Sequence, residues 1–322
     1  MGALLTLRED AVFAGDGWGG QARQVLALGP VSSMAFQGGR VAYVAGGAIL
    51  VADLRGGAPQ RVADAPPAFL LGPDLVWTAD GQALLTVADR EDARAKATGR
   101  SIDIGVVDLP AGPWHPGLAL GDRAGVTILQ APAGATSLLL VAWGPEPVFS
   151  EALRYDLATG RLVATVAMAG EEEVVPSPDG QAALTTLSDR AKGVSASVVY
   201  ELAGDKAAVR QRLEHPKGAH GSGHVWSPDG RRVAYLLREA GGRGLGIWLW
   251  DLETNNTVKV AEASDPSAGP VAWTPDGRYL IYRQVDAAGA ASYRALAPAD
   301  GATRLLAVDP ASQILGWLPA AP

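Results

Sequence analysis

The feature that most constrains the fold is a short turn motif that recurs along the chain. Three copies read Ser/Thr-Pro-Asp-Gly, at 177–180, 227–230 and 274–277, and a fourth at 78–81 keeps the Asp-Gly. Degenerate copies of the motif lie at 35–40 and 129–134. In such a turn Pro presets φ, Asp accepts backbone hydrogen bonds, and Gly adopts the positive φ that closes it. Each motif is therefore predicted to join two antiparallel strands.

A second signal follows most of these motifs: an apolar strand that ends in an acidic residue and Leu, as at Asp53-Leu54 and Asp251-Leu252. The positions that lead the motifs are spaced 41, 53, 46, 50 and 47 residues apart: Phe36, Trp77, Gln130, Pro176, Trp226 and Trp273. A four-stranded propeller blade takes about 40–50 residues. Each repeat is therefore predicted to form four strands, A to D, and the chain an all-β propeller.

We predict one domain over 1–322, a β-propeller of seven four-stranded antiparallel blades. The N-terminal strands would pair with a C-terminal strand and close the ring, which leaves no exposed edge strand. The count would be six if the weakly marked segment 124–167 is something else. The predicted blades are 31–62, 74–120, 124–167, 172–213, 222–261, 269–308, and a composite of 3–28 with 313–318.

Composition excludes several classes of protein. The net charge of −7 argues against nucleic-acid binding, and the absence of Cys excludes disulfides, thiolate zinc sites and Cys nucleophiles. No apolar stretch reaches the roughly 18 residues that span a bilayer, and the N-terminus lacks a basic leader. We expect a monomer, cytoplasmic unless an export signal or anchor was trimmed, and otherwise periplasmic or extracellular.

Two runs carry a family resemblance. The sequences at 226–235 and 273–282 resemble the blade signature of TolB-like propellers, which also occurs in propeller domains of the prolyl oligopeptidase family. The run at 248–252, Trp-Leu-Trp-Asp-Leu, is similar to the end of strand C in a WD-repeat blade. The resemblance implies the fold. It leaves function open, because such propellers serve as periplasmic scaffolds, protease gating domains and lyases.

Propeller geometry assigns the repeated residues to two faces. The A–B and C–D turns emerge on one face, and the B–C and D–A connections emerge on the other. The motif aspartates are therefore predicted to cap turns on a structural face: Asp80, Asp179, Asp229 and Asp276. The motif tryptophans are predicted to pack between blades: Trp77, Trp226, Trp273 and Trp317.

All four histidines are predicted to lie in D–A connections. His115 follows Trp114 after the second blade, and His215, His220 and His224 share a Gly-rich segment. His224 is predicted at the start of an inner strand, close to the central channel. Three imidazoles within ten residues suit a divalent transition metal. A seven-bladed lyase family that acts on oligogalacturonate uses channel-mouth histidines with manganese, but its other ligands cannot be placed in this sequence. We predict no cofactor and leave a divalent metal at these three histidines as an alternative.

The B–C loops of the same face carry charge. The charged segments are 90–100, 189–192 and 238–243, and their arginines are Arg90, Arg94, Arg100, Arg238 and Arg243. We interpret these segments as solvated hairpin tips. The alternative is a rim that binds a protein, peptide, small molecule or anion.

Three functional hypotheses follow. We favour a non-enzymatic binding or scaffold propeller of the bacterial cell envelope, which contacts its partner through the histidine and arginine loop face. The second is a metal-dependent enzyme, such as a polysaccharide lyase, centred on the histidines of 215–224. The third is a sensor domain of a longer membrane-anchored protein. No Gly-x-Ser-x-Gly elbow or nucleotide-binding fingerprint supports hydrolase or nucleotide chemistry.

Overall fold

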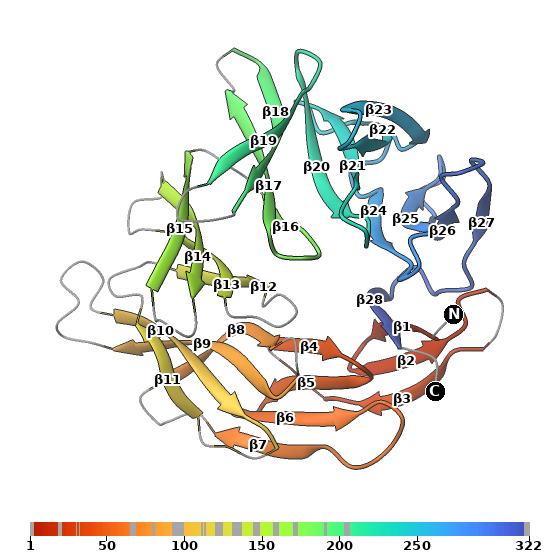
Figure 1. Ribbon diagram of the computed structural model, residues 1–322. Coiled ribbons are helices and arrows are strands. Elements are labelled where there is room, and N and C mark those ends of the chain that lie inside the picture. The colour runs from red at the N-terminus through yellow and green to blue at the C-terminus, as the bar shows by residue number, and fades with distance from the viewer. Residues whose placement is uncertain are drawn as a thin grey trace. The chain divides into compact units, whose positions relative to one another are not determined.

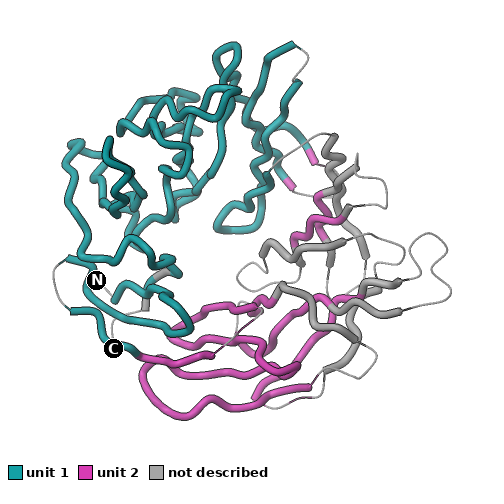
Figure 2. Tube along the Cα trace, turned by 180° about the vertical axis from the view of Figure 1, so that it is seen from behind, with its two compact units in different colours: residues 1–24, 171–201, 208–322 teal, residues 25–170, 202–207 magenta. Residues whose placement is uncertain are grey.

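The chain folds entirely into β-strands, β1 to β28, in the part that the structure describes (Figure 1). The computed structural model describes residues 3–18, 21–29, 31, 33–64, 69–78, 81–91, 100–110, 112, 114–119, 125–130, 137–143, 149–156, 161–169, 173–189, 192–202 and 207–318. These residues form seven four-stranded sheets. They divide into unit 1 (1–24, 171–201 and 208–322) and unit 2 (25–170 and 202–207), coloured teal and magenta in Figure 2.

Unit 1 contains three sheets in which each strand pairs antiparallel with the next in sequence. This is the A-B-C-D order that the repeats predict. The strands of these sheets are β16 (Val174–Pro176), β17 (Ala182–Asp189), β18 (Val194–Glu201) and β19 (Ala208–Glu214); β20 (Ala219–Trp226), β21 (Arg232–Glu239), β22 (Gly244–Asp251) and β23 (Asn256–Ala261); and β24 (Gly269–Trp273), β25 (Leu280–Val285), β26 (Ala291–Leu296) and β27 (Thr303–Leu305).

A further sheet joins the two ends of the chain. Its order is β28 (Gln313–Leu318), β1 (Ala3–Arg8), β2 (Ala11–Gly15) and β3 (Arg23–Ala27). β1 runs antiparallel to β28, with Leu4 opposite Trp317 and Leu7 opposite Gln313. The predicted pairing of the N-terminal strands with a C-terminal strand is therefore present. That this sheet completes a closed ring of seven blades stays a prediction.

Unit 2 repeats the same meander three times. The weakly marked segment 124–167 yields one of these sheets, β12 to β15, as the repeat spacing predicts. The strands are β4 (Ser33–Gln37), β5 (Arg40–Ala45), β6 (Ala48–Asp53) and β7 (Gln60–Asp64); β8 (Phe69–Trp77), β9 (Ala83–Glu91), β10 (Arg100–Asp108) and β11 (Trp114–Ala119); and β12 (Gly125–Gln130), β13 (Ser137–Trp143), β14 (Phe149–Asp156) and β15 (Arg161–Ala169).

The core lies between neighbouring sheets. In unit 1, Leu184 and Val199 of one sheet pack with Trp226, Tyr235 and Trp250 of the next, and all five are buried. Alternate strand residues face the same neighbour, so a period-2 pattern of apolar side chains supplies each interface. Burial of apolar area contributes roughly 25 cal/mol per Å², which makes these interfaces the main source of stability.

The motif tryptophans tie adjacent sheets together. The Trp226 indole donates a hydrogen bond to the Val175 carbonyl at 3.1 Å, and Trp273 repeats this bond to Val225 at 3.2 Å. In unit 2, Trp77 donates to Ala35 at 3.1 Å. The predicted packing role is therefore confirmed for these three residues. Trp317 packs against a buried cluster in unit 1, but its indole nitrogen is buried without a hydrogen-bond partner among the described residues.

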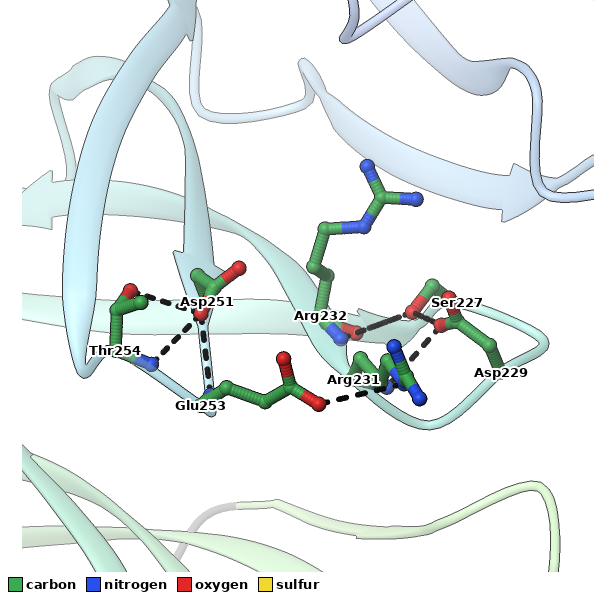
Figure 3. A network of polar contacts seen from close by, with 7 residues as sticks. All are labelled: Ser227, Asp229, Arg231, Arg232, Asp251, Glu253 and Thr254. Atoms are coloured by element: carbon green, nitrogen blue, oxygen red, sulfur yellow. Dashed lines mark hydrogen bonds and ion pairs between the residues drawn. The ribbon is translucent and has the colours of Figure 1, made fainter.

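The motif aspartates cap their turns as predicted. Asp229 Oδ1 accepts hydrogen bonds from Ser227 Oγ at 2.5 Å and from the Arg231 N–H at 3.1 Å (Figure 3). Asp179 and Asp276 repeat this arrangement, whereas Asp80 lies outside the described residues.

The two turns of the sheet β20–β23 meet at the same end. Arg231, in the β20–β21 turn, pairs with Glu253, in the β22–β23 turn, at 3.4 Å (Figure 3). The Leu252 N–H also donates to the Arg231 carbonyl. The A–B and C–D turns of this sheet therefore share one end, as propeller geometry predicts.

The part of the chain that the structure describes contains no helical segment that could span a membrane.

Candidate functional site

The interface between the sheet β16–β19 and the sheet β20–β23 changes from apolar to polar along its length. Leu184 and Val199 face the neighbouring sheet in the apolar cluster around Trp226. Two residues further toward the β17–β18 turn, Thr186 and Ser197 lie opposite each other on the same face. Ser188 and Ser195 form the next such pair. Four hydroxyls therefore continue the face that Leu184 and Val199 begin.

A β-bulge brings His224 into this polar region. The pairing of β20 with β21 shifts register between Ser222 and Val225, and Gly223 adopts a φ of 61°. A bulge adds one residue to a strand and re-aims the side chains beside it. Gly suits the positive φ because it has no Cβ to clash. The His224 side chain is fully buried as a result.

Four side chains form one continuous hydrogen-bonded chain, which we call the histidine chain: Glu173, His224, Ser197 and His215. Glu173 Oε2 lies 2.7 Å from His224 Nδ1, and Ser197 Oγ lies 2.8 Å from His224 Nε2. Ser197 Oγ also lies 2.9 Å from His215 Nε2. The backbone N–H of His224 donates to Glu173 Oε1 at 3.2 Å. The chain joins both sheets through residues that are far apart in the sequence.

Packing fixes both imidazoles. The Tyr235 ring stacks on His224 with centroids 5.6 Å apart and contacts His215 at 5.5 Å. A Cβ at Gly221 would lie 2.8 Å from His215 Nε2 and 3.0 Å from His224 Nε2. Only glycine therefore allows β20 to pass this close to both rings.

The electrostatics of the site define the protonation state of His215. Burial, aided by the neighbouring His224 and His220 and opposed by Glu214, lowers the pKa of His215 to about 4, so this imidazole is neutral at pH 7. For a neutral His224 beside an ionised Glu173, the Nδ1–H donates to the carboxylate, and Ser197 O–H donates to His224 Nε2. His215 Nε2–H then donates to Ser197 Oγ. Each of the three side-chain bonds has one proton.

The order Glu–His–Ser is the order of an orienting acid, a base and a nucleophile. Ser197, however, has no exposed surface, and the His215 imidazole already occupies one of its lone pairs. A substrate carbonyl has no approach to this hydroxyl. The arrangement therefore satisfies buried polar groups and does not present a nucleophile.

The same residues do not fit a metal ion. Both His215 Nε2 and His224 Nε2 are hydrogen-bonded to Ser197, and His224 Nδ1 is bonded to Glu173. The described residues contain no group of three His, Asp or Glu side chains that could hold a metal. A transition metal needs three or four such donors.

A cavity of about 370 Å³ lies beside the hydroxyl pairs, between β17–β18 and the start of β20. Its polar lining comes from Thr186, Ser188, Asp189, Ser195 and His220. Backbone bonds hold its walls. The Gly218 N–H donates to the Gly193 carbonyl at 2.9 Å, and the Ala240 N–H donates to the Gly218 carbonyl at 2.8 Å.

These bonds also test the predicted loop face within unit 1. Gly218 belongs to a D–A connection, whereas Gly193 and Ala240 belong to the B–C turns of the two flanking sheets. Because Gly218 bonds to both, the B–C and D–A connections of these sheets share one end, opposite the Asp-Gly turns.

The structure places the predicted binding residues in different ways. His215 lies in a connection as predicted, but His220 and His224 lie inside β20, and His115 and Trp114 lie inside β11. The prediction that His220 lies in the connection is therefore wrong, because the glycines beside it pair with β21. His224 was predicted at the start of an inner strand, and it does lie in one, β20. His215 and His224 are joined through Ser197, whereas His220 sits opposite Arg238 and lines the cavity.

The arginines of the predicted binding face differ in exposure and in position. Arg243 forms an exposed ion pair with Glu239, with Nε–Oε2 at 3.0 Å, and Arg238 Nε is buried without a hydrogen-bond partner among the described residues. Arg90 and Arg100 lie in β9 and β10 of unit 2, and Arg94 lies outside the described residues. Of these charged tips in unit 1, the Lys192 and Arg243 side chains are exposed, whereas Arg238 is partly buried. The role of the tips in binding stays a prediction.

Sequence reasoning missed Glu173 and Ser197. Glu173 lies 51 residues before His224, and Ser197 lies 27 residues before it. One signal was present: Thr186-x-Ser188 and Ser195-x-Ser197 place hydroxyls at alternate positions on two successive strands, on the face that elsewhere in the repeat is apolar.

No family model matches this chain. A local match joins it to the Tol-Pal system protein TolB of Alcanivorax borkumensis, 43% identical over 56 residues, which are 17% of this chain and 12% of that protein. The match thus covers much less than two thirds of TolB.

Solved structures match over much more of the chain. An oligogalacturonate lyase in complex with manganese is 14% identical with a TM-score of 0.64, over 90% of this chain and 84% of that one. A puromycin-hydrolyzing peptidase of Mycobacterium tuberculosis is 16% identical with a TM-score of 0.63, over 98% of this chain and 54% of that one. At this identity such likenesses show the fold alone. Together with the strand order and the TolB match, they give this chain the TolB-like β-propeller fold that its turn motif predicts.

Proposed function

We propose that this chain is a non-catalytic binding propeller that contacts its partner through the loop face of the sheets β16–β19 and β20–β23. The observation that carries the proposal is the histidine chain. Its two imidazoles and its hydroxyl are buried and bonded to one another, so they serve packing and not chemistry. Beside them, turns tied by backbone bonds offer a preformed surface with a cavity.

We further propose that the partner belongs to the bacterial cell envelope. The resemblance of the blade signatures to TolB-like propellers supports this location, as does the local match to a Tol-Pal system protein. The acidic net charge of −7 is consistent with a protein or small-molecule partner and not with nucleic acid.

Charge reversal on the two ends of unit 1 tests the binding face. Lys192→Glu with Arg243→Glu alters the loop face, and both side chains are exposed. Arg231→Glu with Lys259→Glu is the matched control, at the A–B turn and on the outer strand β23. We expect the first pair to reduce chemical cross-linking to isolated bacterial envelopes, and the second to leave it unchanged. Equal cross-linking by both variants would overturn the assignment of the face.

A metal-dependent enzyme, such as a polysaccharide lyase, is the second candidate. The likeness to a manganese-bound oligogalacturonate lyase over 90% of this chain favours it. Against it stands the misfit of the described donors to a metal. Elemental analysis of purified protein decides between the two. Stoichiometric metal that His224→Ala removes would establish the second candidate, and metal-free protein with an unchanged Tm in added Mn²⁺ would exclude it.

A further inference from the structure

A second cavity of unit 1, of about 430 Å³, lies on the β1–β2 hairpin and shares no lining residue with the cavity beside the histidine chain. Its floor is one face of the hairpin, because alternate residues of β1 line it together with residues opposite them on β2, as Thr6 and Phe13 do. Its other wall is the segment 307–312, which connects β27 to β28.

Two contacts hold this segment against the two ends of the hairpin. The Ala307 N–H donates to the carbonyl of Gly17, which follows β2, at 3.0 Å. At the end of β1, Arg8 Nη1 lies 3.0 Å from Asp309 Oδ2, and the guanidinium lies over the Phe13 ring at 4.9 Å. The walls are therefore preformed, and the volume falls within the roughly 300–1,000 Å³ of small-molecule sites.

Two hydroxyls of the lining have no partner among the described residues. Thr6 and Ser312 are buried residues, and neither side-chain oxygen forms a hydrogen bond within the described chain. The Thr185 and Thr186 oxygens also lack partners, but they are sealed from solvent, whereas the Thr6 and Ser312 oxygens keep open surface. Each hydroxyl can both donate and accept, so the lining fits a ligand that does both.

The chain fold brings these two hydroxyls together. Thr6 pairs with Ile314 of β28, and Ser312 lies two residues before Ile314. Backbone contacts also fix Ser312, because its carbonyl accepts from the Tyr293 hydroxyl at 2.8 Å and its N–H donates to the Asp309 carbonyl at 2.9 Å. One small ligand can therefore contact both hydroxyls.

The charges of the lining favour a neutral ligand. Arg8 and Asp309 are the charged side chains among the described residues that line the cavity, and they are paired with each other. An ionic ligand would therefore meet one like charge for each opposite charge. Exposed Glu9 and Asp10 follow Arg8 in the chain, which further disfavours an anion.

From these observations we propose that this cavity binds a neutral sugar. The hydroxyls of a sugar donate and accept, which matches Thr6 and Ser312, and its C–H groups match the Phe13 ring and the Leu4 and Val308 side chains of the lining. The inference goes beyond the proposed partner-binding function, because the cavity lies on other sheets of unit 1 than the proposed binding face.

The experiment titrates four probes into the full-length ¹⁵N-labelled protein. Methyl glucoside and methyl galactoside are neutral, and methyl glucuronide and methyl galacturonide carry a carboxylate at C6 on the same rings. We expect saturable shifts of the Gly15 and Gly17 amides with a neutral glycoside, and at least about fivefold weaker binding of its uronide. Equal or tighter binding of the uronides would overturn the neutral assignment, and no shift with either neutral glycoside would overturn the site.

Three variants test the two hydroxyls. We expect Thr6→Val and Ser312→Ala each to weaken glycoside binding about threefold to tenfold. Both should fold, because neither hydroxyl is bonded within the described chain. Thr185→Val is the control, since it removes a buried, unpartnered hydroxyl of β17 that does not line this cavity. Wild-type affinity in Thr6→Val or Ser312→Ala, or an equal loss in Thr185→Val, would contradict the proposal.

Failure of this proposal is distinguishable from failure of the partner-binding function. Cross-linking to envelopes is tested through Lys192 and Arg243, and neither residue lines this cavity. Loss of glycoside binding with intact cross-linking would therefore sink the sugar site alone.

Discussion

At the scale of single residues, the unusual feature of this chain is a set of polar groups in the contact between two sheets. Ser197 is fully buried and bridges two imidazoles, and Glu173 anchors the end of the series. Buried polar groups are costly unless every one is bonded, and then they specify a single arrangement. The histidine chain meets this condition, with one proton for each of its side-chain bonds.

The first prediction concerns pH. The pKa of His215 is about 4 in the folded protein and 6.5 in the unfolded chain. Between these values the unfolded state binds the extra proton, so stability falls as pH drops from 6.5 toward 4. The loss from this residue is up to about 3 kcal/mol. Urea unfolding between pH 7.5 and 4 should show that His215→Gln reduces this pH dependence, whereas His220→Gln retains it.

The second prediction concerns the close approach of β20. Gly221→Ala would place a methyl group 2.8 Å from His215 Nε2, and such overpacking costs about 1–3 kcal/mol. Gly241→Ala is the control, because nothing lies within 4 Å of its Cβ position. Chemical denaturation should separate the two variants by at least about 1 kcal/mol, and equal stability would mean that the rings are not packed against β20.

At the scale of elements, each blade is specified locally and joined to its neighbour through distant residues. The turns follow from their own four residues, as the Asp179, Asp229 and Asp276 caps show. The bulge in β20 was not foreseen, because a Gly-rich segment suits a loop equally well and only the pairing with β21 decides the matter. Glu173 and Ser197 were missed for a related reason: their partners lie on another blade, and no local pattern encodes that register.

The third prediction tests the contact between two elements. Trp226→Phe keeps most of the buried ring but removes the indole donor to the Val175 carbonyl. We expect a loss of about 1–3 kcal/mol in the free energy of unfolding, since a buried carbonyl loses its partner and some volume is emptied. The comparison is Trp317→Phe, whose indole nitrogen has no partner to lose among the described residues and should cost less.

At the scale of the whole molecule, the pairing of β1 with β28 joins the two ends of the chain. Leu4 is buried in a cluster with Tyr293 and Ile314, so the N-terminal strand packs with residues from the other end of the sequence. The repeat spacing predicts this pairing because strands without a blade of their own occur at both ends. The number of blades in a closed ring depends on how the two units meet, which spacing alone does not fix.

The fourth prediction uses the absence of native cysteine. Leu7 and Gln313 are directly opposite in the β1–β28 pair, so Leu7→Cys with Gln313→Cys should form a disulfide on mild oxidation. A bond that closes so long a loop stabilises by about 2–4 kcal/mol when the geometry is unstrained. The oxidised variant should unfold at higher denaturant than its reduced form. Failure to oxidise would show that the two strands are not paired in solution.

The most direct test of the account is the imidazole ¹⁵N spectrum of the protein at pH 7.5, before and after added Zn²⁺ or Mn²⁺. In the structure, His215 is hydrogen-bonded to Ser197, and His224 is hydrogen-bonded to both Ser197 and Glu173. This arrangement predicts a neutral His215 protonated at Nε2 and a His224 protonated at Nδ1, both unchanged by metal. Metal-induced shifts or broadening of both rings, lost in His224→Ala, would contradict the account and identify a metal centre.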